Sequence, residues 1–205
     1  MEKLSGKTAL VTGSTDGVGR LVARKLGQAG ARVLVHGRDA ERGARVVADI
    51  EASGGVAAFL AADLSALAEV RRLADAAQAT VDRLDILINN AGIGTAGPRQ
   101  TSAEGSSCGL RSITSPAFCS RCCYCRLSRT ARQRGSLSTV EEGARAILNL
   151  ATSPAVEGQT GLYFNGQHEA KAQAQAYDLD ARRQLQALSL ELTGLSAQGV
   201  AALER

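Results

Sequence analysis

Residues 8–97 alternate between short apolar runs and longer amphipathic runs, and this alternation restricts the fold more than any other feature of the sequence. The apolar runs have the length and composition of buried strands and cover residues 8–11, 32–35, 56–60 and 84–88. Apolar residues recur at helical spacing between them, at 18–28, 40–52 and 65–81. Strands separated by helices of this length form βαβ units around a parallel sheet. The sequence therefore predicts an α/β fold with a doubly wound parallel sheet, whose ligand lies at the carboxyl ends of the strands.

Capping residues mark where several helices begin. Asp39 stands where an N-cap would precede the second helix, and Ser65 is the cap expected for the third. Ser138 followed by Glu141 forms a capping box that opens a further helix at 139–151. These caps divide the chain into elements of ordinary length.

A glycine-rich turn joins the first strand to the first helix, and it reads Thr12-Gly13-Ser14-Thr15-Asp16-Gly17-Val18-Gly19. Glycine lets a backbone bend tightly and approach a pyrophosphate, while a helix N-terminus presents free N–H groups to it. A tight turn without a ligand is the simpler alternative, because a single glycine motif is a weak signal. The turn is thus a candidate phosphate site, and this interpretation needs support from other motifs.

Two further motifs follow the turn: Asp63-Leu64 after the third strand and Asn89-Asn90-Ala91-Gly92 after the fourth. In this order and spacing, the three motifs resemble those of the short-chain dehydrogenase/reductase family. The resemblance is close over 5–97 and resumes at about 138–195, where 161–164 looks like the last core strand and 176–195 is similar to the tail of retinol-dehydrogenase-like bacterial members. It implies a Rossmann-like fold and hydride transfer between NAD(P) and a carbonyl or alcohol.

The resemblance also implies a cofactor-binding role for the residues of each motif. The pyrophosphate would be held by Thr12, Gly13, Ser14, Thr15, Asp16, Gly17, Val18 and Gly19. Asp63 would bond the adenine amino group, Leu64 would flank the ring, and Asn89 would tie the fourth strand to its neighbours. The nucleotide would further be lined by Asn90, Ala91 and Gly92. Without the family context, Asp63 is nearly as well explained as a loop residue before a helix.

Arg38 favours NADP over NAD as the cofactor. It follows the second strand, where an acidic residue would instead bind the ribose 2′-OH of NAD, and a guanidinium suits a 2′-phosphate. The alternative is that Arg38 is a solvated loop arginine and Asp39 only a helix cap.

The acid/base chemistry of the family has no counterpart in this sequence. The family uses a Tyr with a Lys four positions later, and a Ser that orients the substrate oxygen. None of Tyr124, Tyr163 and Tyr177 has a Lys four positions on, and no Lys stands between Lys25 and Lys171. The sequence therefore assigns no catalytic residue. The fifth and sixth strands of the family are absent too, so the predicted sheet is incomplete.

A segment rich in Ser, Arg and Cys stands in their place. These three types make up 17 of the 30 residues at 105–134, without strand or helix periodicity, so we expect 98–137 to be disordered. All five Cys lie here, but the two Cys-x-x-Cys spacings share Cys122, so they supply only one separate pair, and no His is near. The sequence therefore predicts no metal site. An overlapping reading frame permits an apolar helix of the kind the family places here. A frameshift near residue 105, restored near 136, is our hypothesis for this composition.

Composition excludes several classes of function. The chain is 44% apolar and 21% charged, as globular proteins are. Its net charge of +4 rests on 105–140, which holds six Arg and no acidic residue, and the chain has no Trp, so we expect no nucleic-acid partner. No apolar run approaches the roughly 20 residues of a membrane span, and the first strand leaves no room for a signal peptide, so we expect a cytoplasmic protein without a membrane partner. His36 and His168 are expected to be solvated and without a role.

We expect three parts in the chain: a dinucleotide-binding βαβ half at 1–97, an irregular segment at 98–137, and C-terminal helices with the last strand of the same domain at 138–205. One of these helices, at 177–192, is amphipathic and suits core packing or subunit contact equally. The fourth strand would expose an edge that invites self-association, and the run at 161–164 must pack elsewhere or stay loose.

Three functions remain open. The first is an impaired NAD(P)-dependent oxidoreductase. The second is a non-catalytic fragment that binds NADP, with a small-molecule nucleotide as its partner. The third is a Cys-rich module for zinc or nucleic acid.

Overall fold

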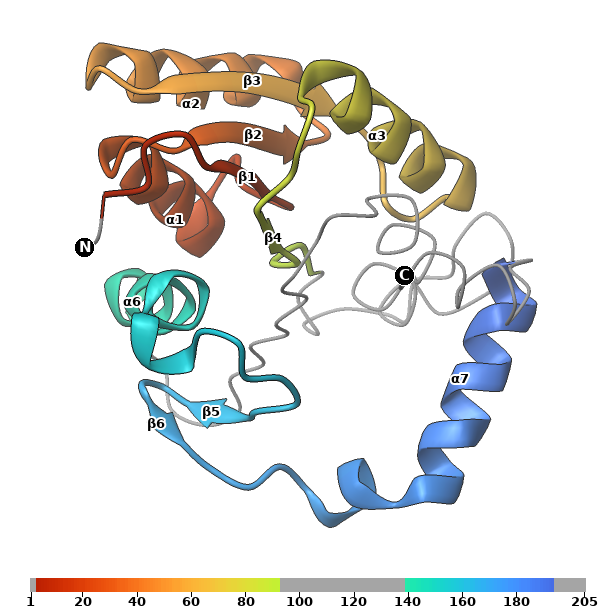
Figure 1. Cartoon of the computed structure of the whole chain (residues 1–205). Coiled ribbons are helices and arrows are strands. Elements are labelled where there is room, and N and C mark those ends of the chain that lie inside the picture. Colours follow the sequence, from red (N-terminus) through yellow and green to blue (C-terminus); the bar gives the residue numbers. More distant parts are fainter. Residues whose placement is uncertain (1–2, 93–138, 194–205) are drawn as a thin grey trace.

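Four parallel strands form the central sheet in the order β3-β2-β1-β4 (Figure 1). The computed structural model describes residues 3–92 and 139–193. The strands are β1 (Thr8–Val11), β2 (Arg32–Gly37), β3 (Val56–Ala61) and β4 (Ile86–Ile88). This arrangement confirms the predicted doubly wound, Rossmann-like α/β fold. No further strand joins this sheet within the described ranges.

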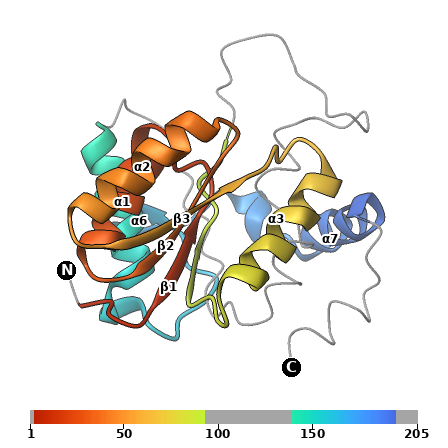
Figure 2. The same cartoon turned by 90° about the horizontal axis from the view of Figure 1, so that it is seen from above.

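Helices cover both faces of the sheet (Figure 2). They are α1 (Gly17–Gln28), α2 (Ala40–Ala52) and α6 (Val140–Thr152) on one face and α3 (Leu67–Thr80) on the other. Successive strand residues point to opposite faces, so Val33 and Val35 pack with the first group and Leu34 with α3. All three are fully buried. The continuous apolar strands of the sequence are thus explained by a sheet that is covered on both sides.

β4 begins later than its apolar run suggests. The prediction started this strand at residue 84, but β4 starts at Ile86. The Asp85 carboxylate accepts the Thr8 backbone N–H at 2.9 Å, and the Asp85 N–H donates to the Thr8 carbonyl at 3.0 Å. A side chain therefore takes the place of a strand neighbour at this end of the sheet, and the regular ladder starts one residue further on.

The predicted caps are correct in one case and wrong in two. The Asp39 carboxylate accepts the Arg42 N–H and caps α2, as predicted. Ser65 does not cap α3, because its own N–H donates to the Asp63 carboxylate and the helix begins two residues later without a side-chain cap. The capping box of α6 is formed by Thr139 and Glu142.

The capping box is therefore shifted by one residue from the predicted Ser138 and Glu141. Thr139 has the extended backbone of an N-cap, and the third helical residue after it is Glu142. From this cap α6 runs along α1. A Cβ added at Gly143 would lie 3.1 Å from a Val18 methyl group, so the two helices pack closely.

The run at 161–164 does not extend the main sheet. Its last residue belongs to β5 (Phe164–Asn165), which pairs antiparallel with β6 (His168–Glu169) in a separate two-stranded sheet. Gly166 has a positive φ of 62°, which lets the chain reverse directly after β5. β5 therefore pairs with the neighbouring β6 and does not take the place in the main sheet that the resemblance implied.

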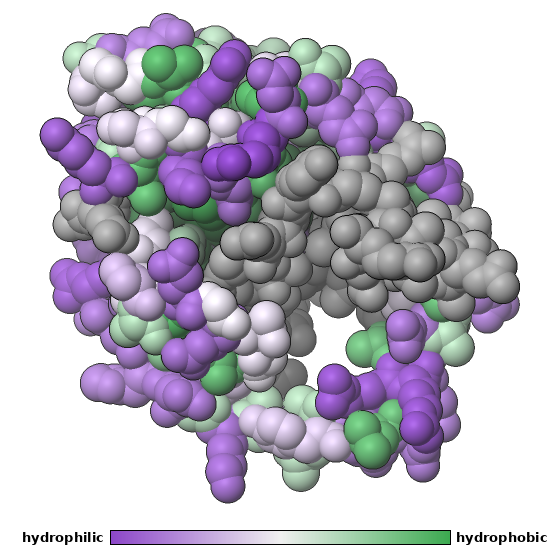
Figure 3. Space-filling model, in the orientation of Figure 1, coloured by the Kyte–Doolittle hydropathy of each residue, from purple (hydrophilic) through white to green (hydrophobic). Residues whose placement is uncertain are grey.

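The C-terminal helix is confirmed as α7 (Leu179–Thr193) and lies away from the sheet (Figure 1). It follows two short 3-10 helices, η1 (Pro154–Val156) and η2 (Ala174–Tyr177). Leu179, Leu185 and Leu188 are exposed on α7, and apolar residues show on the surface of this part of the molecule in Figure 3. Among residues 3–92 and 139–193, no helix is long and apolar enough to cross a membrane. The expected disordered segment at 98–137 lies outside the described residues.

Candidate functional site

The glycine turn is tied to the end of β4 by side-chain hydrogen bonds. Thr12 Oγ1 donates to the Ile88 carbonyl and accepts the backbone N–H groups of Asn90 and Ala91, both at 3.0 Å. The Asn90 side-chain amide donates to the carbonyls of Thr12 and Gly13, also at 3.0 Å. Asn90 therefore ties the end of β4 to the turn, and the first and third motifs of the sequence meet at one edge of the sheet.

Two glycines of the turn are required by close packing. A Cβ added at Gly13 would lie 2.8 Å from the Ala91 Cα, and one at Gly19 would lie 2.3 Å from the Gly13 carbonyl oxygen. Real Cβ atoms do not approach neighbouring atoms so closely. Any larger residue would push the turn away from β4.

Gly17 is different, because the space beside it is open. Its φ is +52°, a conformation that favours glycine, and a Cβ added there would meet nothing within 4 Å in the described structure. The backbone therefore presents a surface that a ligand could approach and that a side chain would fill.

The N-terminus of α1 faces this open space with unused donors. Asp16 caps the helix by accepting the Gly17 N–H at 2.7 Å, and its carbonyl accepts the Arg20 N–H at 3.1 Å. Within the described residues, the N–H groups of Val18 and Gly19 have no acceptor. Two free donors and the positive end of a helix dipole suit an anionic group such as a phosphate.

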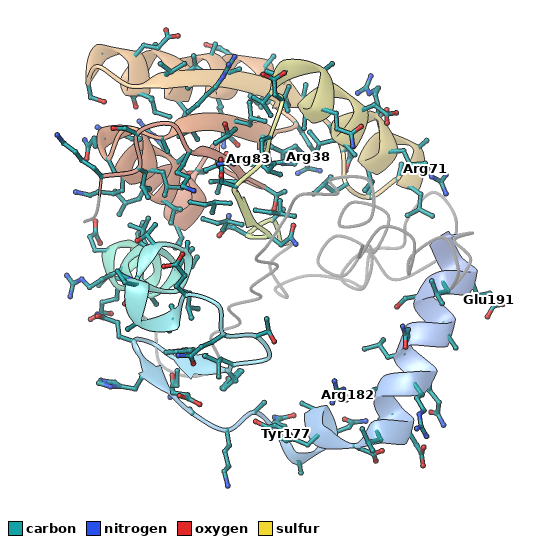
Figure 4. The ribbon with its side chains drawn as sticks, viewed as in Figure 1. Arg38, Arg71, Arg83, Tyr177, Arg182 and Glu191 are labelled. Atoms are coloured by element: carbon teal, nitrogen blue, oxygen red, sulfur yellow. The ribbon has the colours of Figure 1, made fainter. Side chains whose placement is uncertain are left out.

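Charged side chains surround the turn. Arg38 is 73% exposed at the end of β2, and its guanidinium lies 4.0 Å from the Asp63 carboxylate (Figure 4). The Ser65 backbone N–H is the main cause that holds the pKa of Asp63 below its ordinary value, with Arg38 a smaller one. Arg42 lies within 3.5 Å of the carboxylates of both Asp16 and Asp39. Arg42 thus contacts the turn through Asp16, whereas Arg38 contacts the segment after β3 through Asp63.

A shallow cavity of about 280 Å³ adjoins the turn between α1 and α2. It is lined by Thr15, Asp16, Arg20, Arg42, Arg45 and Val46. Three of these residues are arginines and one is acidic, so the lining carries a positive balance. Leu64, by contrast, is buried in the core cluster beside α3, while Gly92 is exposed.

His36 was predicted to be solvated, and that prediction is wrong. The side chain is only 3% exposed, because β2 continues through it to Gly37 and carries the ring under the glycine turn. Its Nδ1 accepts the Gly13 N–H at 3.0 Å. Burial lowers the pKa of His36 to about 4, although the Ala62 backbone and the Asp63 carboxylate act in the opposite direction.

Residues 7–141 match the family model described as short chain dehydrogenase. The chain belongs to this family. It is 43% identical over 99 residues to human "Dehydrogenase/reductase SDR family member 13", an alignment that covers 47% of this chain and 26% of that protein. It is 48% identical over 89 residues to the "Rhamnolipids biosynthesis 3-oxoacyl-[acyl-carrier-protein] reductase" of Pseudomonas aeruginosa, which covers 43% of this chain and 34% of the relative.

Solved structures are similar to this chain over part of their length. A short-chain dehydrogenase/reductase of Serratia marcescens has a TM-score of 0.50 and 26% identity, covering 59% of this chain and 51% of that one. The RhlG/NADP complex of Pseudomonas aeruginosa is 46% identical over 44% of this chain and 36% of that one, with a TM-score of 0.43. The chain spans between about a quarter and two fifths of the length of the first curated relatives it matches.

The structure describes two tyrosines, Tyr163 and Tyr177. Tyr177 lies well away from the sheet (Figure 4), where its hydroxyl accepts the Ala172 N–H at 2.9 Å. Tyr163 precedes the β5–β6 hairpin. Tyr124 and all five Cys lie outside the described residues, as does the predicted frameshift segment. Within the described residues, no group of three His, Cys, Asp or Glu side chains could hold a metal ion.

Proposed function

We propose that this short-chain dehydrogenase family member binds NADP at the glycine turn, in preference to NAD. The observation that carries the proposal is the open space at Gly17, next to the unused N–H groups of Val18 and Gly19. The turn would hold the pyrophosphate, and Asp63, Asn90, Ala91 and Gly92 would line the adenosine and ribose. The family assignment supports this use of the site, as does the 46% identity to a protein described with NADP.

Arg38 supports the preference for the 2′-phosphate. Its guanidinium is exposed and meets the Asp63 carboxylate only at 4.0 Å, a weak contact in water. It is therefore free to turn toward a phosphate, which it can bind with two parallel hydrogen bonds. Arg42 is held by Asp16 and Asp39 and offsets their negative charge near the incoming phosphates.

We further propose that hydride transfer is impaired. Bound NADPH would supply the hydride to a carbonyl, but the sequence offers no Tyr-x-x-x-Lys to move a proton to or from the substrate oxygen. The chain would thus act as a nucleotide-binding unit of an oxidoreductase family. Loss of NADPH absorbance with a small carbonyl compound, abolished in Gly17→Val, would contradict this part.

Binding calorimetry with NADPH tests the site. Gly17→Val fills the open space and is expected to weaken binding at least about a hundredfold, or ~2.7 kcal/mol. Gly54→Val is the matched control, because Gly54 also has a positive φ and open space beside it but follows α2 at the opposite end of the sheet. It should lose similar stability and keep its affinity. Equal affinity in the Gly17 variant and the wild type would refute the proposal.

A further inference from the structure

His36 is the buried polar side chain that lies closest to the glycine turn and that the proposed function does not use. Hydrogen bonds from both its side chain and its backbone join this one residue to two consecutive residues of the turn. Nδ1 accepts the Gly13 N–H at 3.0 Å, the His36 N–H donates to Ser14 Oγ at 2.9 Å, and the His36 carbonyl accepts the Ser14 N–H at 2.9 Å. The start of the turn is therefore fastened to β2 as well as to β4.

The role of Nδ1 as an acceptor fixes the tautomer of the ring. An imidazole nitrogen that accepts carries no proton, so the neutral ring carries its proton on Nε2. Nε2 is buried and makes no hydrogen bond of normal geometry among the described residues, although the Ala62 backbone is close enough to favour a proton on the ring. The well-formed hydrogen bond of the ring is therefore the one that Nδ1 accepts from the turn.

The Gly13 N–H is the group whose direction this acceptor sets. Gly13 has a φ of +63° and packs on Ala91, so its amide cannot turn without moving the turn off β4. While Nδ1 holds this N–H toward β2, the N–H groups of Val18 and Gly19 at the open side remain free. Without the acceptor, the Gly13 N–H would be a buried donor with no partner, and the turn would shift to satisfy it.

We propose that His36 is a positioning residue of the nucleotide site, whose Nδ1 holds the glycine turn in the shape that presents the Val18 and Gly19 amides to a phosphate. This inference rests on the proposed nucleotide binding. The backbone of His36 also bonds to the turn, but only its side chain holds the Gly13 N–H.

Protonation of the ring would remove the acceptor. Asp63 is the charged group that acts on His36, and Arg38 in turn lies 4.0 Å from Asp63. Burial outweighs the Asp63 carboxylate and keeps the ring neutral at ordinary pH, so the acceptor is present where the protein would work. Nucleotide affinity should therefore be constant near pH 7 and fall as the pH approaches the pKa of His36.

Two substitutions separate the acceptor from the volume of the ring. In His36→Asn, the side-chain oxygen takes the position of Nδ1 and can accept the Gly13 N–H. In His36→Leu, a methyl group takes that position and cannot. We expect the Asn variant to bind NADPH within about threefold of the wild type and the Leu variant to bind at least about tenfold more weakly.

Hydrogen exchange at the Gly13 amide gives a readout that does not need the nucleotide. Protection of the Gly13 amide should persist in His36→Asn and fall at least about tenfold in His36→Leu. In the wild type, the NMR chemical shifts of the ring nitrogens of His36 should show a proton on Nε2 only. If the His36→Leu variant and the wild type bind NADPH equally, the inference is overturned and the proposed function stays intact. A wild-type protein that does not bind NADPH would end the proposed function and this inference with it.

Discussion

At the scale of single residues, the site consists of side chains that fix backbone groups. Thr12 and Asn90 hold the turn to β4, and His36 holds it to β2. The sequence motifs identified Thr12 and Asn90, because such residues recur at fixed places in this family. His36 was missed because burial depends on the helices and loops around a strand end, which no local pattern contains. The one feature that indicates its burial is that β2 extends to Gly37, two residues past the end of the predicted strand.

The buried histidine predicts how stability depends on pH. His36 takes up a proton near pH 6.5 in the unfolded chain but only near pH 4 in the folded chain. The unfolded state therefore binds more protons between these values, and the free energy of unfolding should fall by about 3 kcal/mol as the pH drops from 6.5 to 4. Denaturant titrations at several pH values measure this loss.

The Asp residues with lowered pKa values begin to add to the loss at about pH 5, where their carboxylates start to protonate in the unfolded chain, so the window from pH 6.5 to about 5 isolates the histidine. His36→Leu should flatten the curve in that window. An unchanged slope in this variant would show that another group is responsible.

At the scale of elements, the strands and helices of residues 8–88 followed from local patterns. Apolar runs marked the four strands, and glycine and aspartate marked helix ends. The failures concern features that local patterns do not decide. The caps of α3 and α6 depend on backbone angles at single residues, and the partner of β5 depends on which strand edge is within reach.

The two-sided burial of the sheet predicts where truncation is costly. Leu34 is fully buried at the centre of β2, so Leu34→Ala should reduce the free energy of unfolding by about 2–5 kcal/mol. Val56 begins β3 at the sheet edge and is 58% exposed, so Val56→Ala should change it by no more than about 0.5 kcal/mol. Urea denaturation at pH 7 compares them. Similar losses in both variants would contradict the packing described for the core.

At the scale of the whole molecule, each outer strand has a single neighbour among the described strands. β4 pairs with β1, and β3 pairs with β2. Unpaired strand edges invite pairing with other chains, and α7 adds exposed leucines. We therefore propose that the chain is marginally stable and self-associates through the β4 edge.

A thermal melt followed by light scattering tests that proposal. The midpoint should lie below about 60 °C, and scattering should rise with protein concentration before the midpoint is reached. A cooperative melt of a monomer above that temperature would show that the edge is protected.

The most direct test of nucleotide binding is a thermal shift titration with NADPH and NADH, in the wild type and in Arg38→Ala. A hundredfold excess of NADPH over its Kd should raise the wild-type midpoint by roughly 5–10 °C. NADH should need a higher concentration for the same rise. Arg38→Ala should lose most of the difference between the two nucleotides. No shift with either nucleotide would contradict the account, because the glycine turn would then be a structural turn without a ligand.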